Sequence, residues 1–313
     1  MPELSVVIPV YNEAENLAEL GAQIRGALRG LDYEAVFVDD GSTDGSFEAI
    51  SKMSAEEPRF KAVRLARNFG QTAAMSAGIA HAGGKITAFL DSDLQNDPAD
   101  IPAMLRRLEE GCDAVSGWRR RRQDAFLTRR LPSMAANALI SWVTGVRLHD
   151  YGCTLKLYRS QFLKDLRLCG EMHRFVPAYA GLMGARIVEM EVNHRPRTRG
   201  VSKYGLSRTF KVVLDLMTVK FMDEYLTKPI YLFGGWGLAT AGLGALMALW
   251  TLYKKFHLGI FVKDQPLFQV SIFLGLVGVQ MVLLGLLAEI LIRIYYDVRE
   301  RQPYFVRERI GFK

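Results

Sequence analysis

Short apolar segments alternate with segments of helical spacing through the first hundred residues. Leu4–Val10 is an apolar run rich in β-branched residues, and Glu13–Leu28 then carries apolar residues at the spacing of a helix face. Three further repeats follow, with strands expected at Ala35–Val38, Ala62–Leu65 and Ile86–Leu90 and helices expected after Asp44, at Gln71–Ala82 and at Pro98–Glu110. This alternation predicts an α/β domain with a mostly parallel, Rossmann-like sheet covered by helices on both faces.

Two long apolar segments dominate the last third of the chain. Pro229–Tyr253 and Leu267–Tyr296 are each long enough for the ~20 residues that a helix needs to cross a bilayer. In the first segment Gly237, Ala241 and Ala245 recur at four-residue spacing, which leaves a smooth face that another helix can approach closely. The sequence therefore predicts two transmembrane helices.

The residues around these spans predict how they are attached. Ser207–Tyr225 mixes apolar residues with lysines, which fits an amphipathic interface helix on a bilayer; a core helix of the first domain is the alternative. Loops with many lysines and arginines tend to stay in the cytoplasm. Positive charge in Arg299–Lys313 and before the first span therefore favours a cytoplasmic location for both ends of the helix pair, although lysines in the connecting loop weaken this inference. We expect an α/β domain at 1–205, the amphipathic helix at 206–226, two spans at 227–298 and a cytosolic tail at 299–313.

Composition narrows the class of partner. A formal charge of +7, with 50% hydrophobic residues, suits anionic lipid headgroups or phosphorylated ligands. A nucleic-acid partner is disfavoured because no aromatic-interleaved basic domain is present. Cys112, Cys153 and Cys169 have neither an even count nor metal-ligand spacing, which favours reduced thiols. The chain enters a strand pattern directly after Met1-Pro2-Glu3, so the first domain is expected in the cytoplasm.

An Asp-x-Asp pair follows the strand expected at Ile86–Leu90. Asp91 and Asp93 in a bend can share one hard divalent cation, Mg²⁺ or Mn²⁺, and Gln95 can add an oxygen ligand. Such a cation would neutralise a departing diphosphate. An isolated Asp-x-Asp is a pair of ordinary loop carboxylates about as often as it is a metal site, so the neighbouring residues decide between the two interpretations.

Two further polar clusters end predicted strands and are expected at the same edge of the sheet. Tyr11 could stack on a base and Glu13 could bind a ribose hydroxyl, while Asp39 or Asp40 could bind the base or ribose. The second cluster also fits a turn in which Asp44 caps the next helix. The arginines between Arg119 and Arg130 fit a solvated face or a membrane-surface patch equally well.

The motifs taken together resemble a known family. Pro9-Val10-Tyr11-Asn12-Glu13, Val38-Asp39-Asp40-Gly41-Ser42-Thr43-Asp44, Arg67-Asn68-Phe69-Gly70-Gln71 and Leu90-Asp91-Ser92-Asp93-Leu94-Gln95-Asn96 occur in the order typical of family 2 inverting glycosyltransferases of the GT-A fold. The paired C-terminal apolar segments resemble its polyprenyl-phosphate glycosyltransferases. These include dolichol-phosphate mannose synthases and bacterial undecaprenyl-phosphate glucosyl and aminoarabinose transferases. Arg122–Asp124 and Asp150–Cys153 look most like the 4-deoxy-4-formamido-L-arabinose transferases.

The resemblance implies roles for individual residues. It implies nucleotide contacts at Pro9, Tyr11, Glu13, Asp39 and Asp91, and a metal and diphosphate site at Asp91, Asp93 and Gln95. It implies that Arg119, Arg129 and Ser133 hold the lipid phosphate, and that Arg197 and Lys203 belong to a loop that closes over the phosphates. Asp93, Asp150, Arg129 and Lys203 are thus candidates for the reacting centre.

A general base is harder to assign. Cys153 stands where one group of the family carries a carboxylate suggested as a base, and Asp150 is the nearest carboxylate. A lipid monophosphate with a second pKa near ~6 is already a largely anionic nucleophile at neutral pH. The chemistry therefore needs no strong base.

The resemblance implies transfer of a sugar from a nucleotide diphosphate sugar, with UDP favoured over GDP, to undecaprenyl phosphate at the bacterial inner membrane. Glucose, mannose or another hexose are alternatives to the formamido-arabinose unit. Relatives form tetramers, so a homo-oligomer is expected. A processive polysaccharide synthase is disfavoured because the sequence lacks Gln-x-x-Arg-Trp and further spans. A membrane-tethered nucleotide-sugar-binding scaffold without turnover is the alternative from another class.

Overall fold

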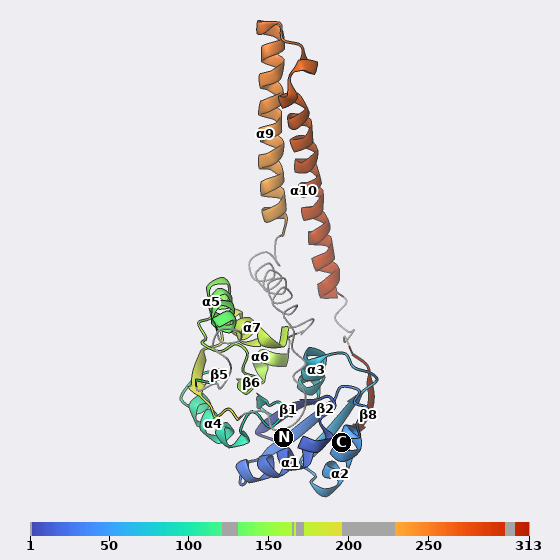
Figure 1. The fold of residues 1–313 in the computed structure, drawn as a ribbon, viewed down its shortest axis with the longest axis vertical. Coiled ribbons are helices and arrows are strands. Elements are labelled where there is room, and N and C mark those ends of the chain that lie inside the picture. Colours follow the sequence, from blue (N-terminus) through green and yellow to red (C-terminus); the bar gives the residue numbers. More distant parts are fainter. Residues whose placement is uncertain are drawn as a thin grey trace. The chain divides into compact units, whose positions relative to one another are not determined.

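The computed structural model describes residues 2–120, 131–164, 166, 172–195, 229–297 and 304–312. The chain divides into two compact units (Figure 1). The first comprises Met1–Val219 together with Gln302–Lys313, and the second comprises Lys220–Arg301. The amphipathic helix expected at 206–226 lies outside the described residues.

The first unit begins with the predicted alternation of strands and helices. In chain order the elements are β1 (Leu4–Val10), α1 (Ala14–Ala27), β2 (Tyr33–Asp39), α2 (Ser46–Glu56), β3 (Phe60–Leu65), α3 (Gln71–His81) and β4 (Ile86–Phe89). All seven residues of β1 and of β2 are buried. Continuous burial is what an apolar strand shows when helices cover both faces of the sheet.

The second half of this unit is less regular. It contains a 3₁₀ turn (Pro98–Asp100), α4 (Ile101–Glu109), β5 (Ala114–Trp118), α5 (Leu131–Thr144), β6 (Lys156–Arg159), α6 (Gln161–Lys164), a second 3₁₀ turn (Met172–Arg174), α7 (Val176–Leu182) and β7 (Ile187–Glu191). Of these elements, the sequence patterns predicted α4, at Pro98–Glu110. The short elements from β6 to β7 were not predicted.

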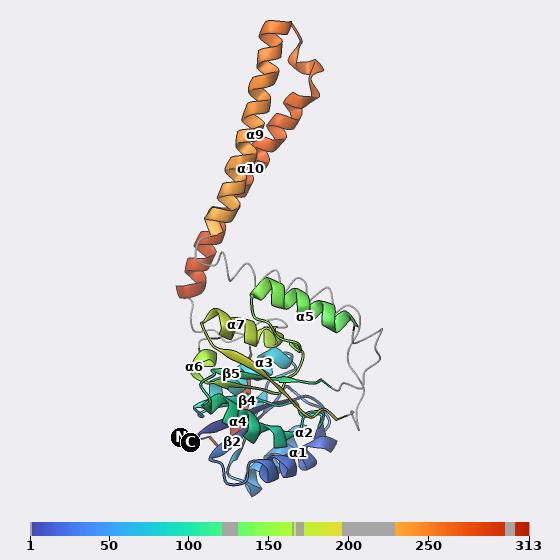
Figure 2. The same cartoon turned by 90° about the vertical axis from the view of Figure 1, so that its left-hand side faces the viewer.

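The strands form one sheet in the order β7-β5-β6-β4-β1-β2-β3-β8. β1 pairs in parallel with β2 and β4, β2 pairs in parallel with β3, and β5 pairs in parallel with β7. β6 runs antiparallel to both of its neighbours, β4 and β5. The sheet is therefore mixed but mostly parallel, which confirms the predicted fold class, and helices lie on both of its faces (Figure 2).

The C-terminal segment belongs to this sheet. β8 (Val306–Ile310) pairs antiparallel with β3, although it follows the two long apolar helices in sequence. Tyr304 is buried in an apolar cluster that includes Val63 of β3 and Ala77 of α3. The sequence patterns predicted a cytosolic tail at 299–313; in the structure the final strand of this segment instead pairs with β3 and covers that edge of the sheet.

The second unit is a pair of long helices, α9 (Pro229–Leu258) and α10 (Pro266–Asp297), joined through a 3₁₀ turn at Val262–Asp264. Both helices are long and apolar enough to cross a membrane, with candidate spans at Tyr231–Leu258 and Pro266–Ala288. The unit thus contains the two apolar helices that the sequence predicts.

The two helices pack closely through small residues. A Cβ atom added to Gly237 would lie 2.7 Å from the backbone oxygen of Gly278, and one added to Gly244 would lie 2.8 Å from that of Ser271. Ala241 contacts Gly278 in the same face. The prediction of a smooth face holds for Gly237 and Ala241, but Ala245 is exposed and the helix phase places Gly244 in the contact instead.

Candidate active site

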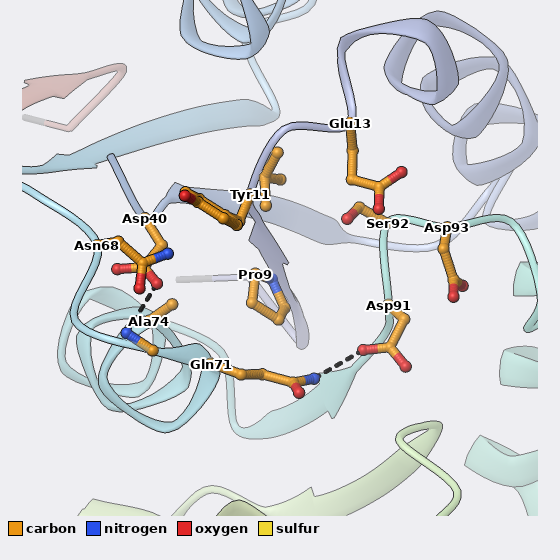
Figure 3. Close-up of a pocket in the computed structure, with 12 residues that line it drawn as sticks. Pro9, Tyr11, Glu13, Asp40, Asn68, Gln71, Ala74, Asp91, Ser92 and Asp93 are labelled. Atoms are coloured by element: carbon orange, nitrogen blue, oxygen red, sulfur yellow. Dashed lines mark hydrogen bonds between the residues drawn. The ribbon is translucent and has the colours of Figure 1, made fainter. Parts of the chain in front are cut away.

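A cavity of about 220 Å³ lies at the carboxyl ends of the central strands. Its walls come from the ends of β1 and β4, from the residue after β2, and from the start of α3 (Figure 3). The lining residues are Pro9, Val10, Tyr11, Glu13, Asp40, Asn68, Gly70, Gln71, Ala74, Asp91, Ser92 and Asp93. The three polar clusters expected at one edge of the sheet therefore do converge.

The Asp-x-Asp bend directly follows β4, and both carboxylates line the cavity. The backbone N–H of Gln95 donates to Oδ1 of Asp93 at 3.2 Å. Leu94 has a φ of 61°, in the left-handed region that is unfavourable for every residue with a Cβ atom. Its side chain is buried in the main core. Burial of Leu94 thus holds the strained backbone that turns the chain between Asp93 and Gln95.

Gln95 is fixed from the other side by a segment distant in sequence. Its carbonyl oxygen accepts a hydrogen bond from the backbone N–H of Arg195 at 2.9 Å, and Asn96 forms a β-bridge with His194. Arg195 also pairs with Asp97. Gln95 lies beside the bend but not among the cavity-lining residues, so its predicted role as a metal ligand stays a prediction.

The two aspartates at the end of β2 occupy different environments. Asp39 is fully buried, with Oδ1 accepting from the backbone N–H of Ser42 at 3.2 Å and Oδ2 lying 3.8 Å from Nε of Arg64. Asp40 lines the cavity, yet its two oxygens accept from the backbone N–H groups of Phe69 and Gly70, both at 2.8 Å. Burial raises the pKa of both carboxyl groups.

The first motif supplies the wall that Pro9, Tyr11 and Glu13 form. Oε2 of Glu13 accepts from the side-chain amide of Asn16 at 2.6 Å. Asp44 accepts from the backbone N–H groups at the starts of two helices, Ala14 of α1 and Ser46 of α2, both at 3.0 Å. Asp44 thus binds the first N–H of α2, as the predicted capping role requires, although Gly45 occupies the N-cap position, and it also links the starts of the two helices.

Gln71 lines the site but was not among the site residues predicted from the sequence. It is the first residue of α3, lines the cavity, and donates from Nε2 to Oδ1 of Asp91 at 3.0 Å. Asn68 also lines the cavity. Their presence in the Arg67–Gln71 motif was the available signal, but the motif by itself names no partner for either amide.

Arg119 and Asp150 form a buried ion pair. Nε of Arg119 lies 2.7 Å from Oδ2 of Asp150, and Nη2 lies 2.9 Å from Oδ1. Burial lowers the pKa of Arg119 and the bonds to Asp150 raise it, with a net increase. Lys156 lies in the same region and donates to the carbonyl oxygen of Tyr151 at 2.8 Å; burial lowers its pKa to about 8. Burial also raises the pKa of the Cys153 thiol to about 11, which keeps it protonated at neutral pH.

Of the other residues predicted to bind the phosphate groups, the structure describes only the position of Ser133. Ser133 lies in the first turn of α5. Arg129, Arg197 and Lys203 lie outside the described residues, so their roles stay predictions.

Comparison with known proteins identifies the family. The profile of glycosyl transferase family 2 matches residues 5–181. The chain belongs to this family. As a family 2 glycosyltransferase it is an enzyme, and the resemblance noted from its motifs is confirmed.

Two groups of curated relatives match nearly the whole chain. A dodecaprenyl-phosphate galacturonate synthase from Rhizobium johnstonii is 45% identical over 98% of this chain and 92% of its own length. An undecaprenyl-phosphate 4-deoxy-4-formamido-L-arabinose transferase from Aeromonas hydrophila is 37% identical over 97% and 93%. The one from Shewanella sediminis is 38% identical over 97% and 92%.

A solved structure confirms the GT-A fold. Glucosyl-3-phosphoglycerate synthase from Mycobacterium tuberculosis, in complex with Mn²⁺, UDP and phosphoglyceric acid, matches with a TM-score of 0.56 and 17% identity. The match covers 71% of this chain and 78% of that one.

The donor atoms at the bend fit a hard cation. Asp91 and Asp93 offer carboxylate oxygens, which Mg²⁺ and Mn²⁺ prefer. Among the described residues no group of three His, Cys, Asp or Glu side chains could hold a metal ion.

Proposed function

We propose that this enzyme transfers a sugar from a UDP-sugar to a polyprenyl phosphate at the cytoplasmic face of the bacterial inner membrane, with inversion at the anomeric carbon. The supporting observation is the extent of the similarity. Relatives named as polyprenyl-phosphate sugar transferases match 97–98% of the chain, through both the α/β unit and the two apolar helices. A scaffold without turnover is disfavoured because the cavity keeps both Asp91 and Asp93.

The step itself needs few groups from the protein. A phosphate oxygen of the acceptor forms a bond to the anomeric carbon while the bond from that carbon to the donor diphosphate breaks, and the electron pair leaves with UDP. The acceptor phosphate is mostly ionised at neutral pH, so no proton has to be removed first. Positioning and electrostatic stabilisation therefore carry the rate.

Each wall of the cavity has a role in this proposal. Pro9, Tyr11, Glu13 and Asp40 face the nucleotide, and Asp39 supports that wall from within the core. Asp91 and Asp93, with Gln95 beside them, would hold Mg²⁺ or Mn²⁺. When bound, the cation supplies Lewis-acid stabilisation of the departing diphosphate. Asp150 has its oxygens engaged by Arg119, so we assign it to holding Arg119 for the acceptor phosphate rather than to accepting a proton.

The acceptor is a lipid, and the α/β unit has an apolar surface that suits one. Met134, Ala138 and Trp142 lie four residues apart on α5 and are exposed, with Trp142 at 81%. A tryptophan on an exposed apolar face is favoured at a membrane interface. We assign this face to the lipid, and, from the family resemblance, Arg119, Arg129 and Ser133 to the lipid phosphate.

The order of the strands supports the proposed topology. β3 and β8 pair in one sheet, yet α9 and α10 lie between them in sequence. A pair of helices that crosses the membrane and returns to the same sheet has both of its ends on one side. That side is the cytoplasm if the enzyme uses a nucleotide sugar made there.

The transferred sugar is proposed from the relatives. Galacturonic acid is favoured because the galacturonate synthase is 45% identical, against 36–38% for the formamido-arabinose transferases. The product would be a lipid-linked sugar for modification of lipid A or another cell-envelope glycan. By family resemblance we expect a homotetramer, which crosslinking in membranes would detect.

A transfer assay with the full chain in detergent tests the proposal. The purified enzyme is incubated with undecaprenyl phosphate and Mn²⁺ or Mg²⁺. The donors are UDP-galacturonic acid, UDP-4-deoxy-4-formamido-L-arabinose, UDP-glucose and GDP-mannose, each tested separately. Mass spectrometry of the lipid fraction is expected to show one polyprenyl-phosphate sugar whose formation stops on adding EDTA.

The other outcomes separate the alternatives. Donor hydrolysis without a lipid product would contradict the proposed acceptor. Binding of every donor without consumption of any would favour the scaffold interpretation. A product from a hexose donor alone would keep the reaction and replace the sugar.

A further inference from the structure

The amide of Gln71 connects two elements that are distant in sequence. Gln71 begins α3, Asp91 follows β4, and Nε2 of Gln71 lies 3.0 Å from Oδ1 of Asp91 (Figure 3). Both side chains line the cavity. An amide donor that faces a carboxylate restricts the rotation of that carboxylate.

The start of α3 is itself fixed by Asp40. The two carboxylate oxygens of Asp40 accept from the backbone N–H groups of Phe69 and Gly70 at 2.8 Å. Gly70 has a φ of 99°, a conformation that favours glycine, and it directly precedes Gln71. A Cβ atom on Gly41 would lie 2.5 Å from the carbonyl carbon of Arg67, so the two loops are in close contact here.

These contacts form a chain across three strand ends. Asp40 follows β2, the loop it binds follows β3, and Asp91 follows β4. β1, which lies between β2 and β4 in the sheet, supplies Pro9 and Tyr11 to the same cavity.

We propose that Gln71 is a positioning residue for Asp91, and that Asp40 acts through the Phe69–Gly70 backbone to hold Gln71 in place. In this role Gln71 orients the first carboxylate of the Asp-x-Asp pair before a divalent cation and diphosphate arrive. The proposal rests on the function proposed above and deepens it. It assigns to the Arg67–Gln71 motif a part in cation binding rather than in nucleotide recognition.

The test compares UDP binding with and without Mn²⁺, using calorimetry on the full chain in detergent. The measured quantity is the factor by which saturating Mn²⁺ tightens UDP binding. Gln71→Met keeps the length and volume of the side chain but removes the donor. We expect it to reduce this factor about tenfold, the effect of one lost hydrogen bond to a charged group, while UDP affinity in EDTA changes less than twofold. Gln71→Asn, whose amide is too short to reach Asp91, is expected to give the same loss.

Gln161→Met is the matched control. Gln161 also begins a helix, α6, but it is exposed and does not line the cavity. Its substitution is expected to leave the factor unchanged. Asp40→Asn is expected to lower the factor, and the double variant Asp40→Asn/Gln71→Met is expected to lower it no further than the more severe single variant does.

The outcomes distinguish this proposal from the one it rests on. If Mn²⁺ does not tighten UDP binding to the unaltered enzyme, the proposed metal-dependent function fails first. If it does, and Gln71→Met retains the full factor, the role of Gln71 is overturned. Equal weakening of UDP binding with and without Mn²⁺ would also overturn it, because Gln71 would then act on the nucleotide or on the fold in general.

Discussion

The guanidinium of Arg119 meets the carboxylate of Asp150 at two points, with Nε 2.7 Å from Oδ2 and Nη2 2.9 Å from Oδ1. Oδ1 also accepts from the backbone N–H of Gly152 at 3.1 Å, and Asp150 is 3% exposed. Such a pair fixes the guanidinium in one orientation. The geometry therefore favours a role for Asp150 in placing Arg119.

Asp150→Asn is expected to raise the KM for polyprenyl phosphate about tenfold, because one of two charge-assisted bonds to Arg119 is lost. The shape of the pH profile of kcat should not change. Steady-state kinetics at several pH values checks this. A base at this position would instead give a large fall in kcat and loss of the acidic limb of the profile.

Asp93→Ala is expected to lower the transfer rate by about 10²–10³-fold, because the departing diphosphate loses electrostatic stabilisation. The melting temperature should stay close to that of the unaltered enzyme, since Asp93 lines an open cavity. Glu110→Ala, at an acid that pairs with Arg107 on the surface, serves as the control. Retained transfer by Asp93→Ala would remove the Asp-x-Asp pair from the mechanism.

A buried residue replaced by alanine usually leaves a more stable protein than one replaced by glycine, and at Leu94 we expect the opposite. Both substitutions lose the buried side chain, which costs about 2–4 kcal/mol. With a φ of 61°, alanine retains the left-handed strain of about 1 kcal/mol and glycine does not. Leu94→Gly should therefore be the more stable variant in denaturant unfolding. Greater stability of Leu94→Ala would contradict the strain.

Lys156 makes stability depend on pH. Burial lowers its pKa from 10.5 to about 8, so between these values the unfolded chain binds more protons than the folded protein. The free energy of unfolding therefore gains a contribution as pH rises from about 8 to 10.5 and loses it as pH falls. Lys156→Met removes this titration. Between pH 8 and pH 10 we expect the melting temperature of the unaltered enzyme to rise relative to that of Lys156→Met. A difference in melting temperature that stays constant over this range would refute the lowered pKa.

Tyr304 tests whether the C-terminal segment is part of the folded unit. Its ring is buried against α3 and β3, and its hydroxyl has no hydrogen-bond partner in the part of the chain that the structure describes. Tyr304→Phe should be neutral or stabilising by about 1 kcal/mol, because a buried polar group is removed. Tyr304→Ala should cost about 3 kcal/mol or more. If neither Tyr304→Phe nor Tyr304→Ala changes the free energy of unfolding, the C-terminal segment does not pack against α3 and β3.

The hydrophobic pattern was enough to predict the first half of the fold. Buried parallel strands are continuous apolar runs and their helices repeat every 3.6 residues, so β1 was expected at Leu4–Val10, where it is found, and α3 within one residue. The strand ends then determined where Asp91 and Asp93 lie. β6, with its buried Lys156, and the charged edge strand β8 lack that pattern, because partners distant in sequence decide their pairing.

The sequence by itself determined the fold class, the two apolar helices and the edge of the sheet where the polar clusters meet, because each depends on local periodicity or composition. Only the tertiary structure decided which neighbouring side chain is used. Asp40 rather than Asp39 lines the cavity, and Gly244 rather than Ala245 lies in the helix contact. It also brought Gln71 to Asp91 and Asp150 to Arg119. Contacts across twenty or more residues depend on strand order and backbone phase, which local patterns do not encode.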